Sequence, residues 1–186
     1  PAGNNTRRTG GGSGSNDTLL VSHNASFTYE SFEGRGGDDF IDGRGGYDQV
    51  VYNNDTTTIS GINVQLAAGI VTGDGSIGTD TLRAVEAVRG TNFDDIFDAT
   101  GYGLAGALNV STTNGSFNDF GGAGGNDTVT GNGFTRLNYQ LAIGSVTVDL
   151  ETSVIGTTTA ITVVGTATGA GEGTDSLTGV NAVQGS

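Results

Sequence analysis

The residues of this chain that are best suited to chemistry are aspartates that follow glycine-rich turns at a regular spacing. From Gly34 to Val50 the chain reads GRGGDDFIDGRGGYDQV, which contains one nine-residue pattern twice. Glycine fills the first and fourth places, Asp39 and Asp48 fill the sixth, and an aliphatic residue fills the eighth. Glycine permits positive-φ turns in which carbonyl oxygens can converge on one centre. Because carbonyl and carboxylate oxygens suit a hard cation, and calcium tolerates irregular geometry better than magnesium does, the pattern predicts Ca²⁺ as the cofactor.

The glycine-aspartate pattern recurs elsewhere in the chain. GGSGSNDTLL from Gly11 and GGAGGNDTVT from Gly121 are close copies, and GSIGTDTL and GTNFDDIF are looser ones. The sixth places of these four copies hold Asp17, Asp127, Asp80 and Asp95. One step of nine residues back from Asp39 puts Glu30 in the acid place. Because separate copies keep one frame, the pattern indicates a repeat architecture rather than a disordered linker.

Short strands must position these aspartates. The apolar eighth place stays in register over four successive steps, at Phe32, Ile41, Val50 and Ile59. This spacing predicts very short strands whose apolar side chains fill a thin core. The one window with helix-like spacing, TLRAVEAV, is short and rich in β-branched residues, so we interpret it as strand and turn.

A longer duplication predicts two related halves. GTDTLRAVEAVRGT from Gly78 returns as GTDSLTGVNAVQGS from Gly173, which adds Asp175 to the acid places. An alternating strand, INVQL or VTVDL, precedes each copy, and GGYDQVVY and GNGFTRLNY form a further matched pair upstream. We predict a first repeat unit in residues 1–100, an irregular connection in residues 101–120 and a second, truncated unit in residues 121–186. Because the second copy stops where the first continues into NFDDIF, we expect this chain to be a module of a longer protein.

The composition argues against several classes of partner and site. The chain has 20 acidic and 7 basic side chains and a formal net charge of −13, which disfavours binding to a phosphate backbone. With no cysteine and one histidine, it can form no disulfide or thiolate site and is poorly suited to transition metals. No apolar run approaches the length of a membrane span, and no signal peptide opens the chain, so we expect any export signal to lie outside this segment.

The glycine-aspartate pattern resembles the RTX, or hemolysin-type, calcium-binding repeats, whose nonapeptide is GGxGxDxUx with U a large aliphatic residue. The resemblance covers about half of the chain and implies an all-β fold, a parallel β-roll or β-solenoid with additional longer strands. In that family calcium lies between successive turns on one edge. Turn carbonyls and the sixth-place aspartates of repeats n and n+2 hold the ion. Family members are typically bacterial proteins that leave the cell by type I secretion and fold in extracellular calcium.

The resemblance also implies which residues of this chain bind metal. They are Asp39, Asp48, Asp127, Asp17, Asp80, Asp95, Asp175 and Glu30, with the turn glycines Gly34, Gly36, Gly43 and Gly45. The n and n+2 rule pairs Glu30 with Asp48 and sets Asp39 opposite Thr57, so two tandem repeats do not complete a site. Either flanking degenerate repeats or distant copies must supply the missing ligands.

We therefore expect a calcium-binding structural module of a secreted or cell-surface bacterial protein, of adhesin or surface-layer type, without catalytic activity. Expected partners are calcium ions, neighbouring copies or other domains of the same protein, and cell-surface polysaccharide. One alternative is a carbohydrate-binding or substrate-orienting RTX-type module of a secreted polysaccharide-modifying enzyme. A stripe of aromatic side chains would serve this function: Phe27, Tyr29, Phe32, Phe40, Tyr47 and Tyr52. Another is a small β-helical hydrolase or lyase that uses adjacent acids such as Asp38 and Asp39, although neighbours on a strand point to opposite faces.

Overall fold

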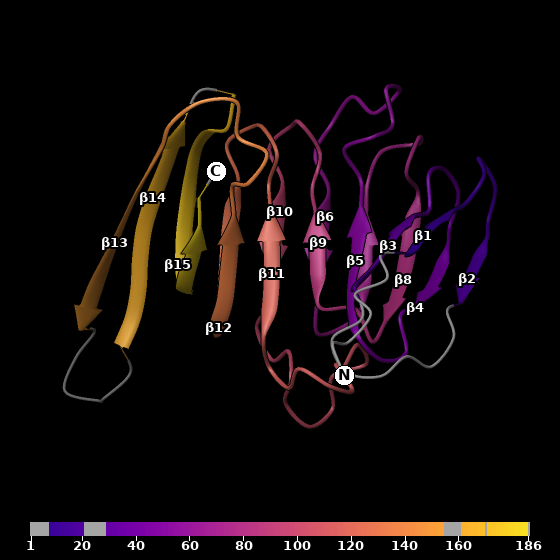
Figure 1. The fold of residues 1–186 in the computed structure, drawn as a ribbon, viewed down its shortest axis with the longest axis horizontal. Helices are drawn as coiled ribbons and strands as arrows, with labels where there is room; N and C mark the ends of the chain where they lie inside the picture. The colour runs from indigo at the N-terminus through magenta and orange to yellow at the C-terminus, as the bar shows by residue number, and fades with distance from the viewer. Residues whose placement is uncertain (1–7, 21–28, 155–160, 170, 186) are drawn as a thin grey trace, which may run out of the picture.

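The protein is all-β, as the sequence predicts. The computed structural model describes residues 8–20, 29–154, 161–169 and 171–185, and these ranges contain no helix, hence none long and apolar enough to cross a membrane. Fifteen strands form one sheet (Figure 1). In chain order they are β1 (Arg8–Gly11), β2 (Thr18–Leu20), β3 (Tyr29–Glu33), β4 (Phe40–Asp42), β5 (Tyr47–Val51), β6 (Asn63–Gln65), β7 (Ile70–Thr72), β8 (Thr79–Arg83), β9 (Ala87–Arg89), β10 (Ile96–Asp98), β11 (Asn118–Gly121), β12 (Thr128–Asn138), β13 (Val146–Val154), β14 (Ile161–Gly169) and β15 (Gly173–Gln184).

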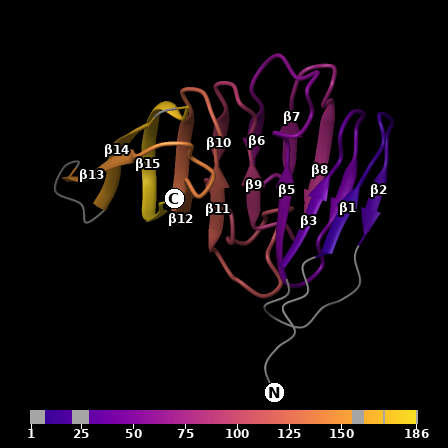
Figure 2. The same cartoon turned by 45° about the horizontal axis from the view of Figure 1, so that its top comes forward.

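The sheet consists of two runs of strands that meet at β12. The first run is parallel and follows the order β1-β3-β5-β9-β11, and β11 pairs with the C-terminal half of β12. The second run follows the order β2-β4-β8-β7-β6-β10, and β10 pairs with the N-terminal half of β12. From β1 to β5 the chain passes alternately between the two runs, so strands close in sequence lie in different runs. Figure 2 shows β10 and β6 lying behind β11 and β9.

The core lies between the two runs. Phe97 of β10 and Phe120 of β11 stack with their ring centroids 4.7 Å apart, although their strands belong to different runs. Three of the four predicted core positions are confirmed, because Phe32, Ile41 and Val50 are at most 2% exposed. The prediction for Ile59 is wrong, since this side chain is 79% exposed. After β5 the chain leaves the nine-residue frame and enters a loop that leads to β6.

The sheet also contains two antiparallel segments. β6, β7 and β8 pair in sequence, and so do β13, β14 and β15. The alternating sequences INVQL and VTVDL contain β6 and the start of β13. TLRAVEAV runs from β8 through a turn into β9, as predicted. Residues 101–117 contain no strand, but Tyr102 within them is buried and its hydroxyl donates to the Val85 carbonyl (3.1 Å).

Candidate metal centre

Several sixth-place aspartates lie directly before a strand of the second run or within its first residues, and hydrogen bonds link them from turn to turn. Asp17 N–H donates to Asp39 Oδ1 (2.8 Å), and Asp39 N–H donates to Asp80 Oδ1 (3.0 Å). Asp39 therefore lies between Asp17 and Asp80, so the prediction that it faces Thr57 is wrong. The reason is that β4 pairs with β2 and β8, and the segment that contains Thr57 is a loop outside the sheet.

The second half of the chain repeats this arrangement. Asp95 N–H donates to Asp127 Oδ1 (2.9 Å), and Asp127 N–H donates to Asp175 Oδ1 (3.0 Å). We call the six residues the aspartate row: Asp17, Asp39, Asp80, Asp95, Asp127 and Asp175. All of them except Asp17 are buried. Distant copies of the pattern thus come together along one edge of the molecule.

A tyrosine hydroxyl closes each half of the row. Tyr52 donates to Asp80 Oδ2 and Tyr139 donates to Asp175 Oδ2, both at 2.8 Å. Both tyrosines are 4% exposed. They end the sequence pair GGYDQVVY and GNGFTRLNY, so the matched segments of the two halves make the same contact.

A second group of acids lies where the chain enters the first run. Glu30 and Asp48 are register partners in β3 and β5, which confirms the predicted pairing of these two residues. Asp48 N–H also donates to Glu86 Oε2 (2.9 Å). We call Glu30, Asp48 and Glu86 the acidic row; all three are at most 1% exposed. The sequence reasoning missed Glu86, and the signal available was its place in the duplicated segment, where an acid in one copy is Asn181 in the other.

Burial raises the pKa of several of these carboxyls. The pKa of Asp48 rises to about 8, because the group is desolvated and because Glu86 and Glu30 repel its charge. Neither Asp48 oxygen has a hydrogen-bond partner within the part of the chain that the structure describes. Burial also raises the pKa of Asp127 to about 8 and those of Asp80 and Asp95 to about 6. Since a buried carboxylate without a counterion is costly, a cation bound beside these groups would stabilise the fold.

The glycines of the turns leave room for these carboxylates. A Cβ at Gly34 would stand 2.2 Å from Asp39 Oδ2, and one at Gly43 would stand 2.6 Å from Asp48 Oδ2. A Cβ at Gly36 would stand 2.9 Å from the carbonyl oxygen of Ser76 in the neighbouring turn. The remaining predicted glycine, Gly45, lies in the turn between β4 and β5. Oxygen atoms therefore crowd the predicted turn positions, and these turns exclude side chains there.

Arginine occupies the second place of two turns. Arg35 and Arg44 have φ values of 69° and 59°, in the left-handed region that favours glycine. The RTX consensus has glycine at this place, and Ala123 in a third turn has φ of 72°. The turn conformation is thus kept even where the residue type opposes it.

The fifth place of the pattern contributes a further row that the sequence reasoning missed. Asp38 N–H donates to Asn16 Oδ1 (2.9 Å), and Thr79 N–H donates to Asp38 Oδ1 (2.8 Å). In the second half, Asn126 N–H donates to Asp94 Oδ1 (2.7 Å). The signal was the recurrence of Asn or Asp immediately before the sixth-place aspartate. Asp38 and Asp94 are exposed, whereas Asp39 and Asp95, the acids that follow them, are buried. The two members of each adjacent pair of acids therefore have different surroundings.

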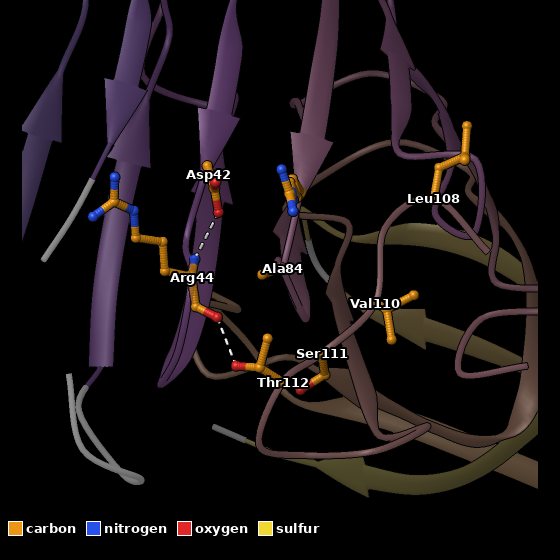
Figure 3. A pocket seen from close by; sticks show the side chains of 8 residues that line it. Asp42, Arg44, Ala84, Leu108, Val110, Ser111 and Thr112 are labelled. Atoms are coloured by element: carbon orange, nitrogen blue, oxygen red, sulfur yellow. Dashed lines mark hydrogen bonds between the residues drawn. The ribbon is translucent and has the colours of Figure 1, made fainter. Parts of the chain in front are cut away.

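A loop covers the turn beside Asp48. The Thr112 hydroxyl donates to the Arg44 carbonyl (2.6 Å; Figure 3). The Thr113 and Asn114 side chains donate to the Gly46 carbonyl. A pocket of about 490 Å³ opens next to this contact, and Asp42, Arg44, Arg83, Ala84, Leu108, Val110, Ser111 and Thr112 line it. Side chains of this loop therefore occupy the Arg44 and Gly46 carbonyls, which lie in the turn before Asp48.

The oxygen atoms of the aspartate row and its turns are of the type that a hard cation prefers, but the described side chains alone do not complete a site. Buried aspartates with raised pKa values face turns rich in main-chain oxygens, which is the ligand chemistry of calcium. In the described ranges, however, no group of three or more His, Cys, Asp or Glu side chains is arranged to hold a metal ion. A calcium site in this part of the chain would therefore need main-chain carbonyls as well as carboxylates.

The predicted aromatic stripe is divided by the fold. Phe32 and Tyr52 are buried, whereas Tyr29 and Tyr47 are half-buried and stack with ring centroids 6.0 Å apart. Phe40 is half-buried, and Phe27 lies outside the described residues. The two stacked tyrosines line a pocket of about 480 Å³ with Gln49, Arg89, Arg136, Asn138, Gln140, Leu141 and Gln184.

The chain has no match among known families or curated proteins: no protein-family model and no curated protein corresponds to it.

Proposed function

We propose that this chain is a calcium-binding structural module of a secreted or cell-surface bacterial protein, of adhesin or surface-layer type, with no catalytic activity of its own. The observation that carries the proposal is the aspartate row, in which sixth-place carboxylates far apart in sequence, all buried except that of Asp17, contact neighbouring turns. The resemblance to RTX repeats supports the same reading. The finer fold we propose is a parallel β-roll, which the alternation of the chain between the two runs from β1 to β5 and the parallel pairing of these strands support.

In this proposal carboxylates of the aspartate row and carbonyls of the turns are the calcium ligands. Asp39 and Asp127 stand in the middle of each half of the aspartate row and would supply carboxylate oxygens. The Oδ2 atom of Asp39 is buried and has no hydrogen-bond partner among the described residues, so it has a lone pair available for a cation. Carbonyls of adjacent glycine-rich turns would complete the shell, and calcium when bound would neutralise the charge that burial opposes. Metal affinity then adds directly to folding free energy, so the module would fold when it reaches extracellular calcium.

Terbium(III) luminescence tests the proposal, because this ion binds calcium-type oxygen ligands and emits when a nearby tyrosine is excited. The Tyr52 and Tyr139 hydroxyls contact members of the aspartate row, and the chain has no tryptophan to contribute a competing signal. We expect bound terbium to show tyrosine-sensitised emission. Added calcium should displace the terbium and abolish this emission, whereas added magnesium should not. The double variant Tyr52→Phe, Tyr139→Phe should lose most of this emission, whereas Tyr29→Phe should keep it.

Circular dichroism supplies the second measurement. The protein should gain strand signal when calcium is added to a chelated sample. Spectra that do not change between chelator and millimolar calcium, together with no terbium emission, would overturn the proposal.

The pocket beside Tyr29 and Tyr47 supports a second candidate function, carbohydrate binding. Stacked tyrosine rings with arginine and amide side chains around them are groups that bind sugar rings and their hydroxyls. Binding of an acidic oligosaccharide in calcium that is lost in Tyr47→Ala, with strand content unchanged, would favour this candidate. Absence of binding across neutral and acidic oligosaccharides would exclude it.

A further inference from the structure

Strands on either side of Gly90, where the copy GTNFDDIF begins, pair in a defined register, and we call the parts of the chain before and after Gly90 its first and second halves. β6 of the first half pairs in parallel with β10, with Asn63 opposite Ile96 and Val64 opposite Phe97. β9 pairs in parallel with β11. At the start of the junction, Ile62 N–H donates to Asp95 Oδ1 (2.7 Å). This junction shows how the end of one repeat unit accepts the beginning of the next.

The chain carries an equivalent of each partner at its two outer ends. VTVDL of β13 corresponds to INVQL of β6, and each strand is the first of an antiparallel trio. GSGSNDTL, which leads into β2, corresponds to GTNFDDIF, which leads into β10. The local geometry agrees as well: Ser13 N–H and hydroxyl donate to the Asp17 carboxylate (2.5 and 2.9 Å), as Thr91 N–H and hydroxyl donate to that of Asp95 (2.8 and 2.9 Å).

Both equivalent strands lie at an edge of the sheet. Among the described residues, β13 pairs only with β14, and β2 pairs only with β4. An unpaired strand edge is a template for pairing with another chain.

Apolar side chains at these two ends are only partly buried, whereas the corresponding side chains at the internal junction are fully buried. Ile62, Val64 and Leu66 around β6 are at most 2% exposed, whereas the corresponding Val146, Val148 and Leu150 are half-buried against the same core. Phe97 of β10 is 0% exposed, whereas the corresponding Leu19 is half-buried. Val88 and its counterpart Val183 differ in the same way, at 0% and 37% exposed. The β13 end and the β2 end of the chain therefore each have a partly exposed apolar surface. By analogy with the internal junction, the β2 end of another molecule would cover the surface at the β13 end.

We propose that β13 of one molecule pairs in parallel with β2 of a second copy of this chain, in the register of the internal junction. Thr147 then lies opposite Thr18 of the second copy, Val148 opposite Leu19 and Asp149 opposite Leu20. Val146 N–H donates to Asp17 Oδ1 of the second copy, as Ile62 does to Asp95. The contact is head-to-tail and leaves both outer ends of the pair open, so it continues into filaments. The inference is independent of the proposed calcium function, because it rests on strand register and burial.

One residue distinguishes the outer contact from the internal one. Ser145 stands where the internal junction has Gly61, and a Cβ at Gly61 would lie 1.8 Å from the Asp94 carbonyl oxygen. In the proposed contact this Cβ moves the turn away from the second copy and weakens the pairing. Ser145→Gly should therefore strengthen the association, and Gly61 itself offers the structural precedent.

Cysteine cross-linking tests the register, because the chain contains no cysteine of its own. Thr18 and Thr147 are both exposed, so Thr18→Cys and Thr147→Cys preserve the core. Partner Cα atoms of adjacent strands lie about 4.8 Å apart, within the range of about 4.4–6.8 Å that a disulfide spans. An equal mixture of the two variants, mildly oxidised in calcium, should form a cross-linked heterodimer, and neither variant alone should do so. The register control is Thr147→Cys mixed with Leu20→Cys, whose Cα atoms would be about 8 Å apart and should cross-link poorly.

Sedimentation of the protein without cysteines supplies the second readout. At about 0.15 M salt, where the Debye length is about 8 Å and repulsion between the acidic copies is reduced, the average mass should rise with protein concentration. It should rise further in Ser145→Gly. A protein that stays monomeric at every concentration, or cysteine variants that cross-link equally well with themselves, would overturn the proposal.

Discussion

The carboxylate of Asp48 creates an electrostatic demand for a counterion, because it is fully buried between Glu30 and Glu86. Among the described residues neither of its oxygens has a hydrogen-bond partner, and burial together with the neighbouring acids raises its pKa to about 8. A neutral side chain at this position would remove the buried negative charge, and a bound cation would neutralise it. The two cases differ in how stability responds to calcium.

Asp48→Asn should stabilise the calcium-free protein and weaken its response to calcium. At about pH 8 the free energy of unfolding should rise by about 1–3 kcal/mol in chelator, since the amide removes a buried charge that Glu86 and Glu30 repel, and an uncompensated buried polar group costs at least about that much. The gain on adding calcium should shrink. Thermal unfolding followed by circular dichroism measures both effects. Asp149→Asn, at an exposed carboxylate outside both rows, is the matched control and should leave both unchanged. A loss of stability in chelator would contradict the argument.

The turns depend on glycine at the first place of the pattern because the aspartate folds back onto it. A Cβ at Gly122 would lie 1.6 Å from Asp127 Oδ2, whereas a Cβ at Gly14 would meet no atom within 4 Å. Gly122→Ala should therefore lower the free energy of unfolding by about 1–3 kcal/mol, the usual cost of overpacking. Gly14→Ala is the control and should change it little. Urea unfolding of both variants at one calcium concentration provides the comparison, and equal midpoints would show that the turn tolerates the added atom.

The short strands were predictable from sequence, but the stacking of the turns was not. The nine-residue spacing correctly placed Phe32, Ile41 and Val50 in the core, because adjacent repeats obey it. Neighbours in the aspartate row are separated by 22, 41, 32 and 48 residues, because loops and antiparallel strands of different lengths intervene. A fixed spacing cannot anticipate such separations, which is why Thr57 was wrongly set opposite Asp39. The duplicated segments were a better guide, since Tyr52 and Tyr139 make the same contact in both halves.

The whole molecule carries a net charge of −13, and the folded state concentrates part of this charge in buried rows. In the unfolded chain the same carboxyls are solvated and separated. Folding without a cation therefore favours uptake of protons by the carboxyls whose pKa values are raised. Folding with calcium favours the opposite, because the ion replaces those protons.

The stability of the calcium-free protein should consequently fall as pH rises. The pKa values of Asp80 and Asp95 increase to about 6 in the folded state, and those of Asp48 and Asp127 increase to about 8. An unfolded aspartate titrates near pH 3.9, so between about pH 4 and pH 8 the folded state binds more protons and loses stability with each step upward. Thermal unfolding in calcium-free buffer should give a higher midpoint at about pH 5 than at about pH 8, and saturating calcium should reduce or reverse the difference. Calorimetric titration with calcium at about pH 6 should release protons, seen as heat that depends on the buffer. A calcium-free midpoint that rises over this range would show that the buried carboxylates are compensated by the protein itself, and calcium would then have no charge to neutralise.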